Sequence, residues 1–242
     1  MAKRRIDLLL VEKSLAENLE KARAFVMAGE VTVDGKSVFK PGTLIAEESV
    51  LALNIPQRYV SRGGIKLEYA LEQFRIDVSG KAALDIGAST GGFTDCLLKK
   101  GARRVYAVDV GKGQLDWRLR RDGRVVVMEG LNARYSLDIP EKVDLVTIDV
   151  SFISVEKIVL PALCVMKNDG GIIALIKPQF ESLKREVGRG GVIRDPEVHA
   201  HVLGRFIRRM SKEGLRLRGL TASPISGASG NREFFVFLGL PD

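Results

Sequence analysis

The chain has 242 residues, enough for one α/β domain of ordinary size and a small additional unit. Its net charge of +8 favours a polyanionic partner over an acidic protein, although many basic soluble enzymes share this balance. Cys96 and Cys164 lack the spacing of a zinc site or a disulfide framework, so we expect two buried thiols. No apolar run approaches the ~20 residues that span a bilayer, and no signal peptide is apparent. We therefore expect a cytoplasmic protein with no membrane or metal partner.

The first 59 residues have the pattern of a separate small unit. Apolar spacing predicts one helix over about 8–19 and a second over 22–28 that is stopped by Gly29. Two short runs, 31–33 and 36–38, flank Asp34-Gly35, which is a strong hairpin signal. An alternating run at 50–53 predicts one more strand, so we expect two helices packed on a small sheet.

Three motifs of this unit resemble the S4 RNA-binding domain. They are Arg5-Ile6-Asp7, the helix segment from Lys21 to Val26, and the segment from Gly29 to Lys36. The resemblance implies an RNA-facing surface, although interleaved glutamates also fit an ordinary solvated face. The candidate RNA-binding residues of the whole chain are Arg4, Arg5, Lys21, Arg23, Lys36, Arg62, Lys184 and Arg185.

From residue 65 onward, strand and helix patterns alternate after a turn-like linker at 60–64. This alternation is typical of a doubly wound parallel sheet with helices on both faces. We expect strands near 83–87, 104–108, 125–128, 145–149, 171–176, 217–222 and 234–238. The predicted fold class is α/β: a Rossmann-like, seven-stranded methyltransferase sheet over 65–242. In that fold, by resemblance, the last strand is inserted antiparallel.

A glycine-rich turn follows the first of these strands and predicts a nucleotide-type cofactor. The pattern Asp85-x-Gly87-x-x-x-Gly91-Gly92 lacks the Lys-Ser/Thr ending of a P-loop and the spacing of a dinucleotide fingerprint. It looks like an S-adenosylmethionine loop, although packing glycines in a plain turn are an alternative. Asp109 ends the next strand, where a carboxylate can bind a ribose diol. The candidate cofactor-binding residues are Asp85, Gly87, Ala88, Ser89, Gly91, Gly92, Phe93, Asp109 and Asn132; Asn132 is equally a simple turn former.

Four polar residues are candidates for catalysis: Lys66, Asp149, Lys177 and Glu233. Asp149 and Lys177 each follow an apolar strand, at the sheet edge where ligands bind in open α/β folds. Taken singly, Lys66 and Glu233 also fit surface salt bridges. As a set, the four resemble the Lys-Asp-Lys-Glu tetrad of FtsJ-like ribose 2′-O-methyltransferases. That resemblance implies that Lys177 activates the 2′-hydroxyl.

A ribose hydroxyl is a very weak acid, so its attack on a methyl group needs a base or an oriented lone pair. A lysine accepts a proton only when it is neutral, which a neighbouring cation and partial burial favour. Lys66 is a candidate for that cation, whereas Asp149 opposes the effect and is a candidate anchor for the lysine head. The sequence does not rank these contributions.

Seven motifs spread along almost the whole chain resemble the TlyA-type rRNA methyltransferases, also called haemolysin A. They begin at residues 60, 87, 110, 132, 149, 177 and 229. The resemblance implies 2′-O-methylation of a cytidine in rRNA or a ribosomal subunit, with 23S rRNA favoured over 16S rRNA. The alternatives are a non-catalytic ribosome-assembly factor and, with less support, a haemolysin. The oligomeric state is left open.

One loop and three single residues outside these motifs also carry expectations. The segment 182–194 is either a mobile basic loop over the substrate groove or a solvated loop. Trp117 is expected to be a packing residue. His199 and His201 are expected to be structural.

Overall fold

The computed structural model describes residues 3–53, 58–135, 137–183, 186–188, 190–227 and 230–241. The chain divides into two compact units, Met1–Gln57 and Arg58–Asp242, which are described separately. Tyr59 is buried in the core of the second unit, and the Val60 backbone N–H donates to the Asp95 carboxylate over 2.9 Å. The segment predicted as a linker over 60–64 therefore packs on the second unit.

In its described residues, the first unit contains β1 (Lys3–Arg5), α1 (Ile6–Glu12), α2 (Leu19–Met27), β2 (Val31–Val33), β3 (Lys36–Val38), β4 (Leu44–Ala46) and β5 (Leu51–Leu53). The two helices close a core around Ile6, Leu10 and Val26. β1 pairs antiparallel with β4, and a separate sheet has the order β3-β2-β5. The predicted hairpin is confirmed: Asp34 and Gly35 both have positive φ, as a tight two-residue turn requires.

The prediction of one helix over 8–19 is wrong. α1 ends at Glu12, and Ser14 has a φ of +57°, outside the right-handed helical region. A new helix starts after Asn18, whose side-chain oxygen accepts a hydrogen bond from the Lys21 N–H at 2.9 Å. This N-cap satisfies one of the free N–H groups of α2, so Leu19 belongs to the second helix.

The second unit is built on a sheet of seven strands, as predicted. The strands are β6 (Ala82–Ile86), β7 (Arg104–Asp109), β8 (Val125–Glu129), β9 (Val143–Ile148), β10 (Met166–Ile176), β11 (Arg216–Ala222) and β12 (Phe234–Gly239). Their order is β11-β12-β10-β9-β6-β7-β8. β12 is antiparallel to both of its neighbours, β10 and β11, whereas β10, β9, β6, β7 and β8 run parallel. The expected antiparallel insertion of the last strand is confirmed.

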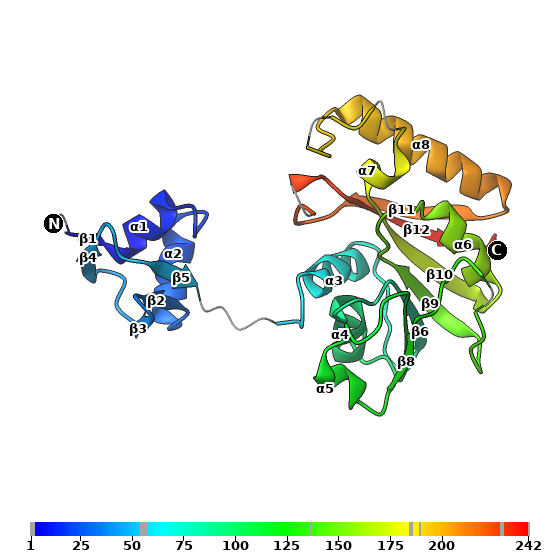
Figure 1. Ribbon diagram of the computed structural model, residues 1–242, viewed down its shortest axis with the longest axis horizontal. Helices are drawn as coiled ribbons and strands as arrows, with labels where there is room; N and C mark the ends of the chain where they lie inside the picture. Colours follow the sequence, from blue (N-terminus) through cyan, green and yellow to red (C-terminus); the bar gives the residue numbers. More distant parts are fainter. Residues whose placement is uncertain are drawn as a thin grey trace. The chain divides into compact units, whose positions relative to one another are not determined.

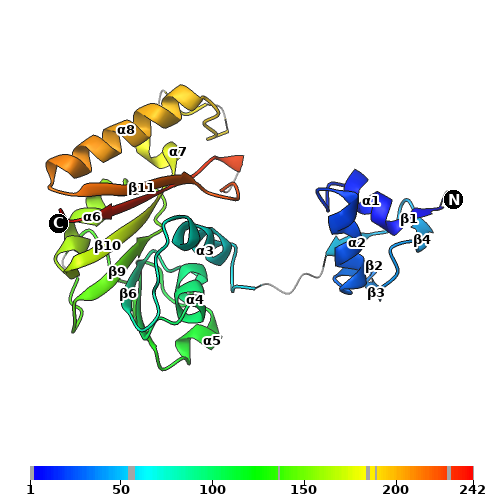
Figure 2. The same ribbon diagram turned by 180° about the vertical axis from the view of Figure 1, so that it is seen from behind.

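Helices cover both faces of this sheet (Figures 1 and 2). They are α3 (Gly63–Gln73), α4 (Gly92–Lys99), α5 (Trp117–Arg120), α6 (Glu156–Leu163), α7 (Pro178–Glu181) and α8 (Pro196–Lys212). α3, α4 and α5 share one apolar cluster with the sheet, and α6 and α8 share another. No helix within the described ranges is long and apolar enough to cross a bilayer.

Two expectations about single residues are wrong. Trp117 is 63% exposed instead of packed, and Cys164 is exposed, whereas Cys96 is buried as predicted. His199 is buried, and its ring Nε2 lies 3.2 Å from the Ile193 carbonyl oxygen, so it has a structural contact.

Candidate active site

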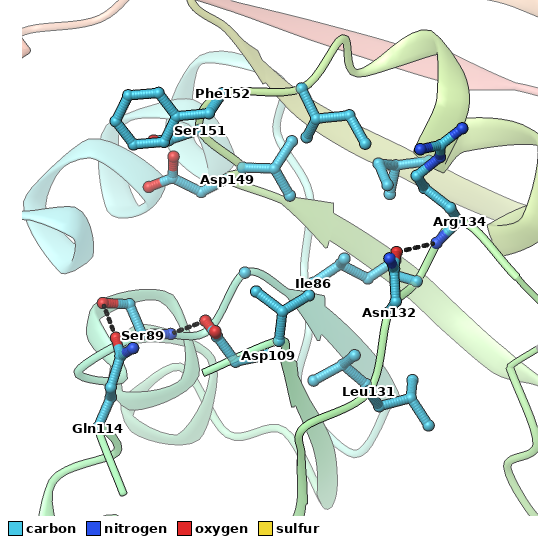
Figure 3. A pocket seen from close by; sticks show the side chains of 17 residues that line it. Ile86, Ser89, Asp109, Gln114, Leu131, Asn132, Arg134, Asp149, Ser151 and Phe152 are labelled. Atoms are coloured by element: carbon cyan, nitrogen blue, oxygen red, sulfur yellow. Dashed lines mark hydrogen bonds between the residues drawn. The ribbon is translucent and has the colours of Figure 1, made fainter. Parts of the chain in front are cut away.

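A pocket of about 560 Å³ opens at the carboxyl ends of the parallel strands (Figure 3). This is the edge where ligands bind in open α/β sheets, and the volume is in the range of small-molecule sites. Four of the predicted cofactor residues line it: Gly87, Ser89, Asp109 and Asn132. Apolar side chains, among them Ile86 and Leu131, form much of the remaining wall.

Gly87 allows the loop after β6 to lie against the end of β9. Its φ is +85°, and a Cβ atom at this position would lie 2.3 Å from the Asp149 carbonyl oxygen. Any side chain would therefore push the two strand ends apart, in addition to the cost of the left-handed backbone. The glycine thus brings the cofactor loop and Asp149 to one side of the pocket.

The carboxylate of Asp109 fixes the shape of the same loop. One oxygen accepts a hydrogen bond from the Ser89 N–H at 2.8 Å, and the other accepts from the Gly111 N–H at 2.7 Å. Each carboxylate oxygen has capacity for a further bond, so the group can also accept from a diol in the pocket. Figure 3 shows Asp109 beside Ser89, with Gln114 on the other side of the serine.

The other predicted cofactor residues do not line the pocket; they are Asp85, Ala88, Gly91, Gly92 and Phe93. Phe93 is buried with its ring centroid 6.2 Å from that of Phe235. A Cβ atom on Gly91 would lie 2.2 Å from Leu119, so this glycine admits a core side chain. The structure places these residues behind the loop, where they support it.

Asp85 is fully buried in β6. Its two oxygens accept hydrogen bonds from the Thr94 hydroxyl at 2.7 Å and from the Thr147 hydroxyl at 3.0 Å. Burial is the largest influence on this group and raises its pKa to about 7, with the nearby Asp149 charge acting in the same direction. Asp85 therefore joins β6, β9 and α4 directly beneath the cofactor loop.

Replacement of Asp85 by Asn should change the pH dependence of the unfolding free energy. The folded pKa of about 7 exceeds the ordinary aspartate value of 3.8, so between these two pH values the folded protein retains a proton that the unfolded chain has released. The contribution of this group is therefore fully present below about pH 4 and is lost as the pH rises to 7. The measurement is urea unfolding of both proteins at a series of pH values. The unfolding free energy of wild type minus that of Asp85→Asn should fall by up to ~4 kcal/mol as the pH rises over this interval. Parallel curves would contradict the assignment.

Lys177 and Asp149 form an ion pair at the ends of two adjacent strands. The Lys177 Nζ lies 2.7 Å from Asp149 Oδ1 and donates to the Ser151 hydroxyl oxygen over 2.9 Å. The Lys177 side chain is only 12% exposed. Asp149 and Ser151 both line the pocket, so the lysine head is held at its border.

Lys66 and Glu233 form a second ion pair, with 2.5 Å between Nζ and Oε2. Their side chains are 10% and 3% exposed, so both charges are largely shielded from water and rely on each other. The sheet register pairs Ile176 with Phe234, which makes Lys177 and Glu233 neighbours across the ends of β10 and β12. The structure thus brings the four predicted catalytic residues together at one edge, as two ion pairs.

Asn231 fixes the chain that leads into Glu233. It is buried; its side chain accepts from the Ile193 N–H at 3.0 Å and donates to the Gly191 carbonyl at 2.9 Å. Its own carbonyl accepts from the Gly227 N–H at 2.9 Å. These bonds connect the start of β12 to the end of the basic loop at 182–194. Lys184 and Arg185, predicted in that loop as RNA-binding residues, lie outside the described residues.

Phe152 is an unusual aromatic residue on the pocket wall. It is 91% exposed and has a φ of +64°, a conformation that bulky residues rarely adopt. Its ring centroid is 4.9 Å from that of Phe180. Backbone strain of this kind persists where the surroundings impose it and is frequent at ligand sites.

Unpartnered polar atoms gather near the same edge. Among the described residues, buried oxygens without a hydrogen bond include Asp149 Oδ1, Gln179 Oε1 and Ser182 Oγ. Asp149 Oδ1 is close enough to Lys177 for an ion pair, but the angles do not make a hydrogen bond. Of these three atoms, only Asp149 Oδ1 belongs to a residue that lines the pocket, and its partner is the Lys177 ammonium.

Two family models match the chain. The FtsJ-like methyltransferase model matches residues 59–240, and the S4 domain model matches residues 4–51. The chain belongs to the FtsJ-like methyltransferase family. Its fold and its enzyme class as a methyltransferase are thereby confirmed.

Similar proteins extend over nearly the full chain. The Bacillus subtilis protein YqxC, whose name describes an rRNA methyltransferase, is 49% identical over 99% of this chain and 86% of its own length. The Mycobacterium tuberculosis 16S/23S rRNA (cytidine-2′-O)-methyltransferase TlyA is 46% identical over 98% of this chain and 91% of its own length. A solved structure from Streptococcus thermophilus, which carries the name hemolysin, is 42% identical with a TM-score of 0.76, covering 100% of this chain and 90% of that one. The resemblance to the TlyA group is confirmed.

In the S4 domain, two of the predicted RNA-binding arginines hold a buried carboxylate. The Arg5 guanidinium makes two hydrogen bonds to Asp7, at 2.6 and 3.0 Å, and Arg23 makes a third at 3.1 Å. Arg5 is the main cause of the lowered pKa of the Asp7 carboxyl, which is itself 0% exposed. Each arginine is still about half exposed, so both remain on the surface of the unit.

The other predicted RNA-binding residues of the described regions lie on the surface. Arg4 pairs with Glu12 at 2.8 Å, and Lys21 pairs with Glu17 at 2.6 Å. Lys36 and Arg62 are exposed. Surface pairs of this kind contribute little to stability, so these cations remain able to exchange partners.

Proposed function

We propose that this methyltransferase transfers the methyl group of S-adenosylmethionine to the 2′-hydroxyl of a cytidine in rRNA. The observation that carries the proposal is the Lys177 and Asp149 pair at the border of the pocket, with the Lys66 and Glu233 pair beside it. The choice of rRNA as the substrate and of cytidine as the nucleotide comes from the names of the relatives. An S4 domain on the same chain fits an RNA substrate.

The pocket fits the cofactor by its chemistry. Asp109 can accept the hydrogen bonds of the ribose diol, while Ile86 and Leu131 offer apolar walls for the adenine. Gly87 allows the backbone to approach closely where any Cβ atom would strike Asp149. When bound, S-adenosylmethionine supplies a methyl group on a sulfonium centre, which is the electrophile of the reaction.

Lys177 would accept the proton of the 2′-hydroxyl. Only the neutral amine can do so: Nζ would take the proton of the ribose oxygen as that oxygen bonds to the methyl carbon, while the methyl–sulfur bond would break with its electron pair left on sulfur. The contacts to Asp149 and Ser151 hold the amine in one place, so that the attacking oxygen meets it in a fixed geometry. Glu233 lies at the neighbouring strand end and binds Lys66 of α3, and this pair can position the ribose.

Phe152 would hold the target base. A nucleotide that enters the pocket would leave its stack, and an exposed aromatic ring would compensate for the lost stacking. The strained, almost fully exposed ring of Phe152 at the pocket wall is suited to this contact.

The proposal is tested by tritiated-methyl transfer to unmodified 23S and 16S rRNA, each as naked RNA and in isolated subunits. We expect incorporation at a cytidine ribose, detected as a dinucleotide that resists alkaline hydrolysis because its 2′-oxygen is blocked. The comparison of the two rRNAs and of naked RNA with subunits identifies the substrate. Incorporation into a base, or cofactor binding without transfer to any of these substrates, would contradict the proposal.

A further inference from the structure

Trp117 is the single tryptophan of the chain, and it lies on the surface of the methyltransferase unit. The side chain is 63% exposed, at the first position of α5. The guanidinium carbon of Arg121 lies 5.6 Å from the centroid of the ring. Exposed aromatic rings and arginine side chains are the groups on which bases stack at sites that bind single-stranded nucleic acid.

α5 holds Trp117 firmly beside the cofactor loop. The Asp116 N–H donates to the Thr90 carbonyl over 3.2 Å, and the buried Leu119 fills the space left open by Gly91. Gln114, three residues before the tryptophan, lines the pocket. The ring is therefore presented by an anchored element close to the pocket, next to α4 in Figure 1.

Most of the arginines near α5 are already paired. Arg118 binds Asp116 with both guanidinium arms, at 2.9 and 3.0 Å, and Arg124 binds Asp122 in the same way. Arg120 pairs with Glu129. In the part of the chain that the structure describes, Arg121 makes no salt bridge, so it can bind a phosphate without giving up a carboxylate partner.

We propose that Trp117 and Arg121 form a stacking platform for an unpaired nucleotide of RNA that lies next to the pocket. The indole would stack on the base, and the guanidinium would bind the adjacent phosphate or extend the stack. The inference rests on the proposed function only in taking RNA as the ligand; it requires no methyl transfer. It adds an RNA contact on the methyltransferase unit to the one expected of the S4 domain.

Because Trp117 is the single tryptophan, its fluorescence reports this contact directly in the full-length protein. We expect a single-stranded oligocytidylate to quench the emission to saturation. The midpoint of this titration should equal the midpoint measured by fluorescence polarization of a labelled copy of the same RNA. An emission that does not change, whether or not polarization shows binding, would overturn the proposal. Quenching without methyl transfer to rRNA would leave this proposal standing and contradict the proposed function instead.

Substitutions give an independent measure of the same surface. Trp117→Ala should weaken RNA binding about tenfold, and Trp117→Phe should retain most of the affinity, because stacking needs an aromatic face. Arg121→Gln and Arg118→Gln change the net charge equally, but Arg118 is already bound to Asp116. We expect the larger loss of affinity for Arg121→Gln. Equal affinities for wild type, Trp117→Ala and Arg121→Gln would overturn the proposal.

Discussion

Replacement of Lys177 by Met is expected to lower the rate of methyl transfer by about 10² to 10⁴-fold and to leave S-adenosylmethionine binding intact. The reason is geometric: Lys177 touches Asp149 and Ser151 at the border of the pocket, whereas the cofactor residues Gly87 and Asp109 lie on other loops. Single-turnover transfer to rRNA measures the first quantity, and calorimetric titration of the cofactor measures the second.

A matched control exists on the same two strands. Lys167 on β10 pairs with Asp144 on β9 at 2.6 Å, near the opposite, amino-terminal end of the parallel strands. Lys167→Met removes the same charge from a more exposed lysine–aspartate pair between the same two strands, far along them from the pocket. We expect it to retain the transfer rate, so that the loss in Lys177→Met is assigned to position and not to charge.

Lys177→Arg separates a base from a fixed positive charge. The guanidinium remains protonated at all accessible pH values and therefore cannot accept the ribose proton. If Lys177 acts as the base, the arginine variant should be as slow as the methionine variant. If the arginine variant retained most of the wild-type rate, an electrostatic role would replace that of base.

Much of the second unit could be predicted because buried parallel strands appear in the sequence as continuous apolar runs. The run at 83–86, which is interrupted by Asp85, and the run at 172–176 correspond to β6 and the end of β10, and both are buried throughout. The short strands β1 and β4 carry no such signal: Lys3–Arg5 is entirely exposed. Pairing with a distant segment, not local pattern, makes it a strand.

The placement of the candidate site residues was predictable to the same degree and for a related reason. Asp149 and Lys177 follow apolar runs, so the topology of the fold places them at one edge. Ser151 and Phe152 lie in a loop where no periodicity distinguishes a pocket residue from a solvated one. The roles of the glycines were ambiguous in the sequence, because a missing side chain can leave space for a ligand or for another side chain. Gly87 lines the pocket, whereas Gly91 leaves space for Leu119.

Lys66→Met and Glu233→Met should each destabilise the protein by about 3–5 kcal/mol, because each leaves the partner charge buried and unpaired. The side chains are 10% and 3% exposed, and a Cβ atom on Gly227 would lie 2.0 Å from Glu233 Oε1, so water has little access. The double variant replaces the pair by apolar chains of similar length and should regain most of the lost stability. Urea unfolding of the four proteins completes the cycle.

The double variant separates a structural salt bridge from a catalytic pair. A merely structural pair is replaceable, so a refolded double variant would recover methyl transfer together with stability. We expect stability to return while transfer remains low, because the register of β10 and β12 places Glu233 beside Lys177 at the edge where we propose that transfer takes place. Cofactor affinity serves as the control, since neither residue lines the pocket. Recovery of both stability and transfer would remove Lys66 and Glu233 from the catalytic group and leave Lys177 and Asp149 to carry the chemistry.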